Sequence, residues 1–387
     1  MQYNHLDIVD LDGSMYTVKN TINKKYIKMG GREVKFLLES IGCVQDDFHF
    51  ADMEELNQTE KELLTQKFDE WGFTGENVEG VNSEKFDITK IKICEIDPCR
   101  FLQRMPKFVK ELFSIKGAVL LGVLTVVAFT LLFGHPDELY RATVDSLHFS
   151  ILQYIIFYFM MIVTTMLHEW GHAICCHRHG GKISSMGMML FFLIPCFFCD
   201  VSDIYMFKDR KKGFSVAVSG IAVNYGLGTI SCILFFLLNR MGIYAPIFMF
   251  YYFANIGFVA FNMIPFVKLD GYWVATALFN VDNLMDKSIL IFLTGILHPT
   301  ELESVQCNPM KKTMLFLYGL SSLAFRPIFW VISVYSLCEF LSDRGMDWMC
   351  GVVVGFVFTV VLKDVMNLLR RYVEMYRNQK QRVLSML

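Results

Sequence analysis

Six apolar runs of 18 to 30 residues constrain this chain more than any other feature of its sequence. A helix needs about 20 apolar residues to cross the hydrocarbon core of a bilayer. Hydrophobic residues make up 54% of the 387 residues and charged residues only 19%, a balance typical of membrane proteins. The sequence therefore predicts an α-helical polytopic membrane protein with about six transmembrane helices, at 117–134, 149–168, 214–238, 243–265, 312–341 and 348–368.

A shorter apolar run covers 186–198 and contains Pro195. It is too short to cross a bilayer as a helix. We expect it to form a re-entrant hairpin, or a hairpin at the membrane edge, because irregular backbone inside a membrane must be shielded from lipid.

Lysine and arginine are distributed unevenly between the loops. They cluster before the first run, after the second, before the third and after the last, whereas the opposite loops carry few of them. Cytoplasmic loops are enriched in these residues. We therefore expect a multi-pass protein of the cell membrane with both termini in the cytoplasm.

Charge and cysteine spacing argue against a nucleic-acid-binding protein and against a disulfide-bonded one. The net charge is −2, and the sequence has no basic patch of the kind that binds nucleic acid. The 11 cysteines have no framework spacing, so we interpret them as free thiols.

Residues 1 to about 105 are soluble in character. We divide the chain into an N-terminal domain at 1–80, a linker at 81–115, a membrane domain at 116–370 and a basic cytoplasmic tail at 371–387. Residue patterns predict strands at 14–19, 24–29 and 88–93, a helix at 33–41, and a second helix at 60–71 capped by Thr59. This mixture indicates a small α+β domain.

The end of the second apolar run carries His-Glu-Trp-Gly-His at 168–172. Positions four apart share one face of a helix, so His168 and His172 can bind the same metal ion. Glu169 lies beside them, where it can take a proton from metal-bound water. The alternative is that both histidines are merely hydrogen-bonded side chains at the membrane boundary.

Catalytic zinc usually has three protein ligands and one open position for water. The best third ligand is Asp270, which follows the fourth apolar run and would lie on the same side of the membrane as His168. A carboxylate at a membrane boundary costs free energy unless it is paired or bound to metal. Asp200 and Asp203 are the alternative third ligands. Two histidines and one carboxylate with an open position suit Zn²⁺.

These segments resemble the site-2 protease family of membrane zinc metalloproteases. Besides 168–172, the segment 262–271 reads Asn-Met-Ile-Pro-Phe-Val-Lys-Leu-Asp-Gly and is similar to the family's N-x-x-P-x-x-x-L-D-G signature. Between them, Ser-Gly-Ile-Ala-Val-Asn at 219–224 resembles the family's A-G-P-x-x-N helix, with isoleucine in place of proline, and we interpret it as a packing motif.

The resemblance covers about residues 150–280 and implies roles for particular residues. His168, His172 and Asp270 would bind Zn²⁺, and Glu169 would be the general base and then the proton donor. Asn262 would hold the substrate backbone. The segment 181–203 would be the family's membrane re-entrant β-hairpin.

The order of elements in the first 72 residues resembles the PqqD-like peptide-recognition element, a winged-helix module that binds leader peptides. Membrane zinc proteases with such a front domain are similar to bacterial peptide zinc metalloproteases found beside peptide exporters. The resemblance implies a peptide partner bound by β-augmentation and an ABC-type exporter as a second partner. The alternative is a small cytoplasmic domain that binds no peptide.

We therefore expect a membrane-embedded zinc endopeptidase that cleaves a ribosomally made peptide precursor, or another membrane-associated peptide, during maturation or export. One alternative is a regulated intramembrane protease of a single-span signalling protein, although its usual PDZ domain has no room here. The other is a peptide-docking adaptor without catalysis. Glu169 argues against an adaptor, because a binding protein has no use for a base beside two ligands.

Overall fold

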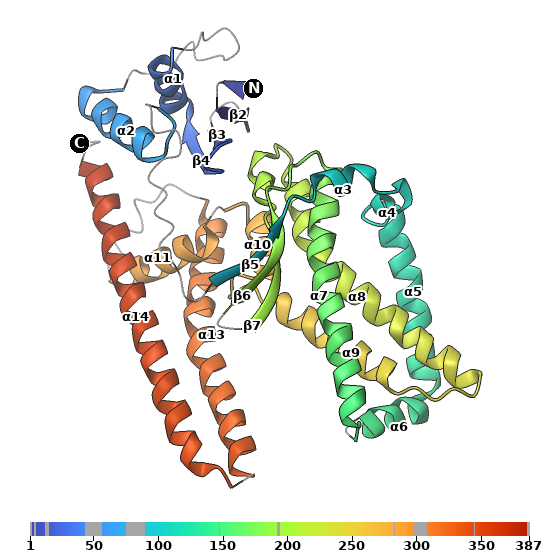
Figure 1. Cartoon of the computed structure of the whole chain (residues 1–387). Coiled ribbons are helices and arrows are strands. Elements are labelled where there is room, and N and C mark those ends of the chain that lie inside the picture. The colour runs from blue at the N-terminus through green and yellow to red at the C-terminus, as the bar shows by residue number, and fades with distance from the viewer. Residues whose placement is uncertain are drawn as a thin grey trace. The chain divides into compact units, whose positions relative to one another are not determined.

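The computed structural model describes residues 2–3, 5–11, 15–42, 56–74, 90–146, 148–191, 194–281, 283–297, 308–343 and 345–384. The chain divides into two compact units, Met1–Met263 and Ile264–Leu387. Figure 1 labels most of their helices and strands.

The first unit begins with a four-stranded antiparallel sheet in the order β1-β2-β3-β4. Its strands are β1 (Gln2–Tyr3), β2 (Leu6–Asp10), β3 (Met15–Asn20) and β4 (Tyr26–Gly30). The two strands predicted on either side of residues 20–23 are confirmed as β3 and β4, whereas β1 and β2 were not predicted.

Two helices, α1 (Gly31–Ser40) and α2 (Gln58–Glu70), share a core with this sheet. Leu6, Val18, Leu37 and Phe68 are fully buried in that core. The predicted cap at Thr59 is wrong. The cap of α2 is Asn57, whose side chain accepts the backbone N–H of Glu60 while the Glu60 carboxylate accepts the N–H of Asn57.

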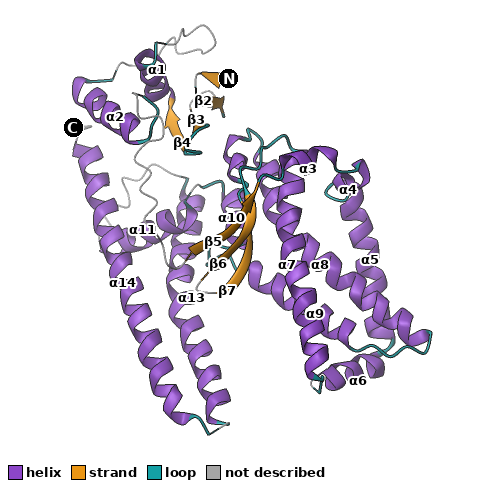
Figure 2. Ribbon diagram, in the orientation of Figure 1, coloured by secondary structure: helices purple, strands orange, loops and turns teal. Residues whose placement is uncertain are grey.

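A second sheet contains β5 (Lys90–Ile96), β6 (Met186–Phe191) and β7 (Ile194–Cys199) in that order. The antiparallel pairing of β6 and β7 confirms a hairpin at 186–198, and its re-entrant or membrane-edge location stays a prediction. The strand predicted at 88–93 corresponds to β5, and residues 88 and 89 of that prediction lie outside the described part of the chain. Strand β5 pairs antiparallel with β6, far away in the sequence (Figure 2). Gly187 permits this pairing, since a Cβ there would overlap the carbonyl oxygen of Cys94.

The other elements of the first unit are helical. They are α3 (Cys99–Arg104), α4 (Lys107–Glu111), α5 (Ile115–Gly134), α6 (Pro136–Ser146), α7 (Ile151–Arg178), the 3₁₀ helix η1 (Ser202–Met206), α8 (Arg210–Arg240) and α9 (Ile247–Asn262). Helix α8 packs against both α7 and α9. Gly171 permits a close contact between α7 and α8, since a Cβ at this position would lie only 2.8 Å from Val223.

The second unit contains α10 (Asp270–Phe279), α11 (Leu284–Leu297), α13 (Pro309–Ser342) and α14 (Asp347–Leu384). Its core gathers Tyr272, Leu284, Met285 and Leu315. Gly319 permits the close packing of α11 and α13, since a Cβ at this position would overlap the backbone oxygen of Ser288. The residues predicted as a basic tail continue α14 up to Leu384.

Within the described residues, five helices are long and apolar enough to cross a membrane: Ile115–Gly134, Ile151–Arg178, Arg210–Arg240, Pro309–Ser342 and Asp347–Asn367. They match five of the six predicted spans. The predicted span at 243–265 forms α9, which is apolar but only 16 residues long. The architecture is consistent with a multi-pass membrane protein that carries a small N-terminal α+β domain.

Candidate metal centre

Helix α7 brings His168 and His172 to one face, as their spacing predicts. Both side chains are buried, with exposed fractions of 6% and 7%. Their Nε2 atoms lie 3.2 Å apart. Two ligand nitrogens at 2.0–2.1 Å from one tetrahedral Zn²⁺ are about 3.3 Å apart, so this separation fits a shared ion.

The other ring nitrogens of both histidines are held by helix α8. His172 Nδ1 lies 2.7 Å from the carbonyl oxygen of Val216, which can only accept, so Nδ1 carries the hydrogen. His168 Nδ1 lies 3.2 Å from Asn224 Oδ1 and donates in the same way. In a neutral imidazole the lone pair is then on Nε2, the atom that points toward the other histidine. Two lone pairs at this distance repel each other, and a shared cation relieves the repulsion.

Gly220 allows α8 to pass directly over the two imidazole rings. A Cβ at this position would overlap His172 Nε2 and would lie 2.7 Å from His168 Nε2. Ser219 adds a second polar group, with its hydroxyl 3.4 Å from His172 Nδ1 and 2.6 Å from the oxygen of Val216. Helix α8 therefore supplies both the space and the hydrogen bonds that orient the histidines.

The packing interpretation of 219–224 was therefore incomplete. Gly220 and Asn224 are one helical turn apart, so both face α7, and Asn224 is fully buried. The sequence feature that could have predicted this contact is an asparagine one turn after a glycine in a largely apolar helical segment, because a buried amide needs a hydrogen-bond partner.

Asp270, the predicted third ligand, is the first residue of α10. Each of His168, His172 and Asp270 offers one ligand atom for a metal ion, and Asp270 as the third ligand stays a prediction. The donor set of two imidazoles and one carboxylate is that expected for catalytic zinc.

The two alternative third ligands have other partners. Asp203 accepts hydrogen bonds from Tyr26 and from the backbone N–H of Lys182, at 2.7 and 2.8 Å. Asp200 accepts from the hydroxyl of Ser202 at 2.6 Å. Neither belongs to the group of potential ligands around His168.

The remaining predicted residues occupy helices α7 and α9. Glu169 follows His168 directly and is half-buried. Asn262 is the last residue of α9 and is 7% exposed. Its amide donates to the carbonyl oxygen of Phe258 at 3.1 Å, and its role toward a substrate stays a prediction.

Comparison of the chain with models of protein families, with curated proteins and with solved structures finds no match. The interpretation of the site therefore depends on its own geometry.

Proposed function

We propose that this protein is a membrane-embedded zinc endopeptidase of the site-2 protease type. The observation that carries the proposal is the convergence of His168 Nε2 and His172 Nε2 to 3.2 Å while α8 occupies both Nδ1 atoms. His168, His172 and Asp270 would hold the ion, which when bound lowers the pKa of water and polarises a peptide carbonyl.

Glu169 is the general base of the proposed reaction. It accepts the proton that water loses as the oxygen attacks the peptide carbonyl, and it then donates that proton to the departing amine. Asn224 and the oxygen of Val216 keep the two imidazoles in one tautomer and one orientation, as partners of metal-binding histidines commonly do. Asn262 is proposed to hold the substrate backbone beside this site.

The proposed substrate is a peptide precursor that the N-terminal domain binds. Strand β4 is at the end of the strand order β1-β2-β3-β4, so in the described part of the sheet only one of its edges is paired. An extended leader peptide would add to the other edge by β-augmentation. An ABC-type exporter is the proposed partner that removes the product, and both termini would face the cytoplasm.

The experiment compares small peptides, by mass spectrometry, from cells that express the parent chain or its Glu169→Gln variant. We expect a trimmed peptide only with the parent, because glutamine cannot accept the proton. Glu339→Gln, an exposed position on α13, is the matched control and should leave trimming unchanged. Zinc bound equally to the parent and Glu169→Gln, with identical peptides in both, would reject the protease and favour the docking adaptor.

A further inference from the structure

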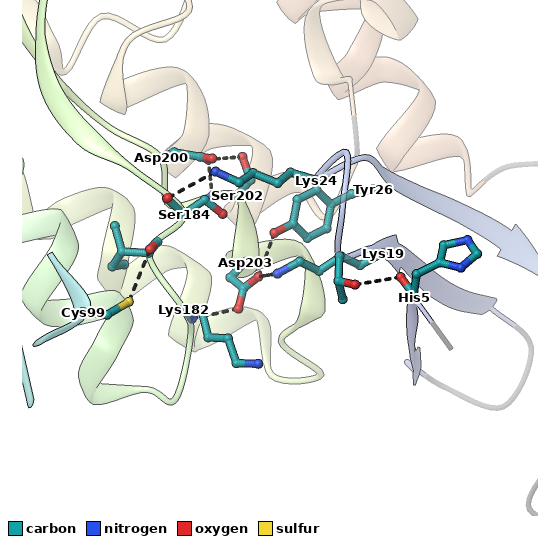
Figure 3. Close-up of polar contacts among 12 residues, drawn as sticks. His5, Lys19, Lys24, Tyr26, Cys99, Lys182, Ser184, Asp200, Ser202 and Asp203 are labelled. Atoms are coloured by element: carbon teal, nitrogen blue, oxygen red, sulfur yellow. Dashed lines mark hydrogen bonds and ion pairs between the residues drawn. The ribbon is translucent and has the colours of Figure 1, made fainter. Parts of the chain in front are cut away.

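The end of the β3–β4 hairpin contacts the residues on either side of the β6–β7 hairpin. Lys19 and Tyr26 are directly opposite each other in the β3–β4 register, so their side chains extend from the same face of the sheet. Both reach Asp203 in η1 (Figure 3). Lys19 Nζ forms an ion pair with Asp203 Oδ1, and the Tyr26 hydroxyl donates to the same oxygen at 2.7 Å.

The second carboxylate oxygen of Asp203 is also used. Oδ2 accepts the backbone N–H of Lys182 at 2.8 Å, which ties the segment before β6 to the segment after β7. Two further contacts continue this surface. Lys24 Nζ donates to the oxygen of Ser184 at 3.2 Å, and the rings of Tyr26 and Tyr205 are 6.1 Å apart.

The ion pair is almost completely withdrawn from water. Lys19 and Asp203 are 6% and 7% exposed. Removing two charges from water is unfavourable, and the pair is retained only where extra hydrogen bonds satisfy both groups. Burial alone would raise the pKa of Asp203, but the hydrogen bonds from Lys19, Lys182 and Tyr26 hold it below its ordinary value. A buried ion pair is weak evidence for added stability, so we assign this pair to the orientation of the two surfaces.

The surface that Lys19 reaches is packed against the metal centre. Ile183, Ile204 and Phe207 belong to the same apolar cluster as Ala173 and Val216. The carbonyl oxygen of Val216 holds His172 Nδ1. The residues around the docking surface therefore share one apolar cluster with Val216, whose carbonyl oxygen holds His172.

We propose that Lys19, Tyr26 and Asp203 are positioning residues, which dock the N-terminal domain on residues 182–206 so that a peptide bound by its sheet enters the metal centre from one direction. The docking is a property of the fold, whereas its purpose rests on the proposed function. The three residues touch neither the reacting atoms nor the metal ligands, so their removal should change delivery of the peptide and not zinc binding.

The test has two measurements on the full-length chain. The first is hydrogen exchange, followed by mass spectrometry, of the protein in detergent micelles. Lys19→Met should speed exchange of peptides from 182–206 about tenfold or more, because an unpaired Asp203 draws water into the surface. Exchange in α2 should stay unchanged. Lys61→Met, which makes the same substitution at a lysine of α2, is the matched control.

The second measurement is the amount of trimmed peptide per bound zinc in cells. Lys19→Met and Asp203→Asn should lower it several-fold while zinc content stays at the parent value, and Lys61→Met should not.

Unchanged exchange in 182–206 for both variants would overturn the docking. If Lys19→Met also speeds hydrogen exchange in α2, the exchange of the Asp203→Asn variant decides whether the domain docks, because this variant leaves the sequence of the N-terminal domain intact. Faster exchange with full trimming would overturn the positioning role. If even Glu169→Gln leaves every peptide unchanged, the proposed protease fails, and the exchange result still decides whether the domain docks through Lys19.

Discussion

His172 Nδ1 donates to the carbonyl oxygen of Val216 at 2.7 Å, so the backbone of α8 sets the orientation of a ring on α7. No substitution of a side chain can remove that acceptor. His168 depends instead on a side chain, Asn224, for the equivalent hydrogen bond. The two histidines should therefore differ in how easily mutation disturbs them.

Asn224→Leu is expected to weaken zinc binding about 10–100-fold, the usual effect of losing the group that orients a metal-binding histidine. The measurement is competition for zinc against a chelator of known affinity. Asn239→Leu, at the other end of α8, removes a hydrogen bond to Glu138 and should leave zinc affinity unchanged. Equal affinity in the Asn224 variant would show that His168 needs no partner.

Gly220→Ala should abolish zinc binding at concentrations that saturate the parent. The added Cβ would overlap His172 Nε2, so either a ring or α8 must move. Overpacking of this kind also costs about 1–3 kcal/mol of stability.

Gly226→Ala is the matched control, because among the described residues its Cβ would meet only Leu121, at an ordinary 3.6 Å. It should keep full zinc content and gain about 0.5–1 kcal/mol from the more favourable helix residue. Both variants are checked by two measurements, the zinc content by elemental analysis and the midpoint of thermal unfolding. A zinc-replete Gly220→Ala protein would contradict the close approach of α8.

Asp270→Asn should lower zinc affinity, since the site would lose its only negatively charged ligand. Asp200→Asn serves as the comparison and should bind zinc as the parent does, because Asp200 bonds to Ser202. The same chelator competition measures both. Loss of zinc affinity in the Asp200 variant alone would show that Asp200, which follows β7, is the third ligand in place of Asp270.

Docking through Asp203 should be independent of pH across the neutral range. The pKa of Asp203 is lowered from its ordinary value of 3.8, so its contribution is present above that pH and is lost as the pH falls below it. Burial and the neighbouring Asp203 carboxylate raise the pKa of Tyr26 from 10.0, so its contribution is present below pH 10 and is lost at higher pH.

Exchange of peptides from 182–206, corrected for the intrinsic effect of pH, should therefore be constant from about pH 5 to 9. A change near pH 6.5 would contradict this assignment and would point to a histidine as the group that controls docking.

Local patterns in the sequence predicted much of the architecture. Apolar runs of about 20 residues identified five helices of membrane-spanning length, because a bilayer requires that length whatever the rest of the fold does. Alternation of residues identified β3 and β4, and the i, i+4 spacing placed His168 and His172 on one face. Each of these features is encoded within a few turns or one strand.

Features that depend on residues distant in the sequence, or on a choice between neighbouring residues, were harder to predict from the sequence. Strand β5 was recognised as a strand, but nothing in its residues named β6 as its partner. The cap of α2 was placed two residues late, because both Asn57 and Thr59 are residues that favour this position.

The sequence by itself determined the long apolar helices of this protein and the paired histidines of its candidate metal centre, since both follow from patterns within one helix. Only the tertiary structure decided what surrounds them. It brought Gly220 and Asn224 of α8 against the rings of α7, and Lys19 against Asp203, which is 184 residues away in the chain. Hydrogen bonds and packing act between atoms that are close in space, and the packing of helices and sheets determines which distant residues become neighbours.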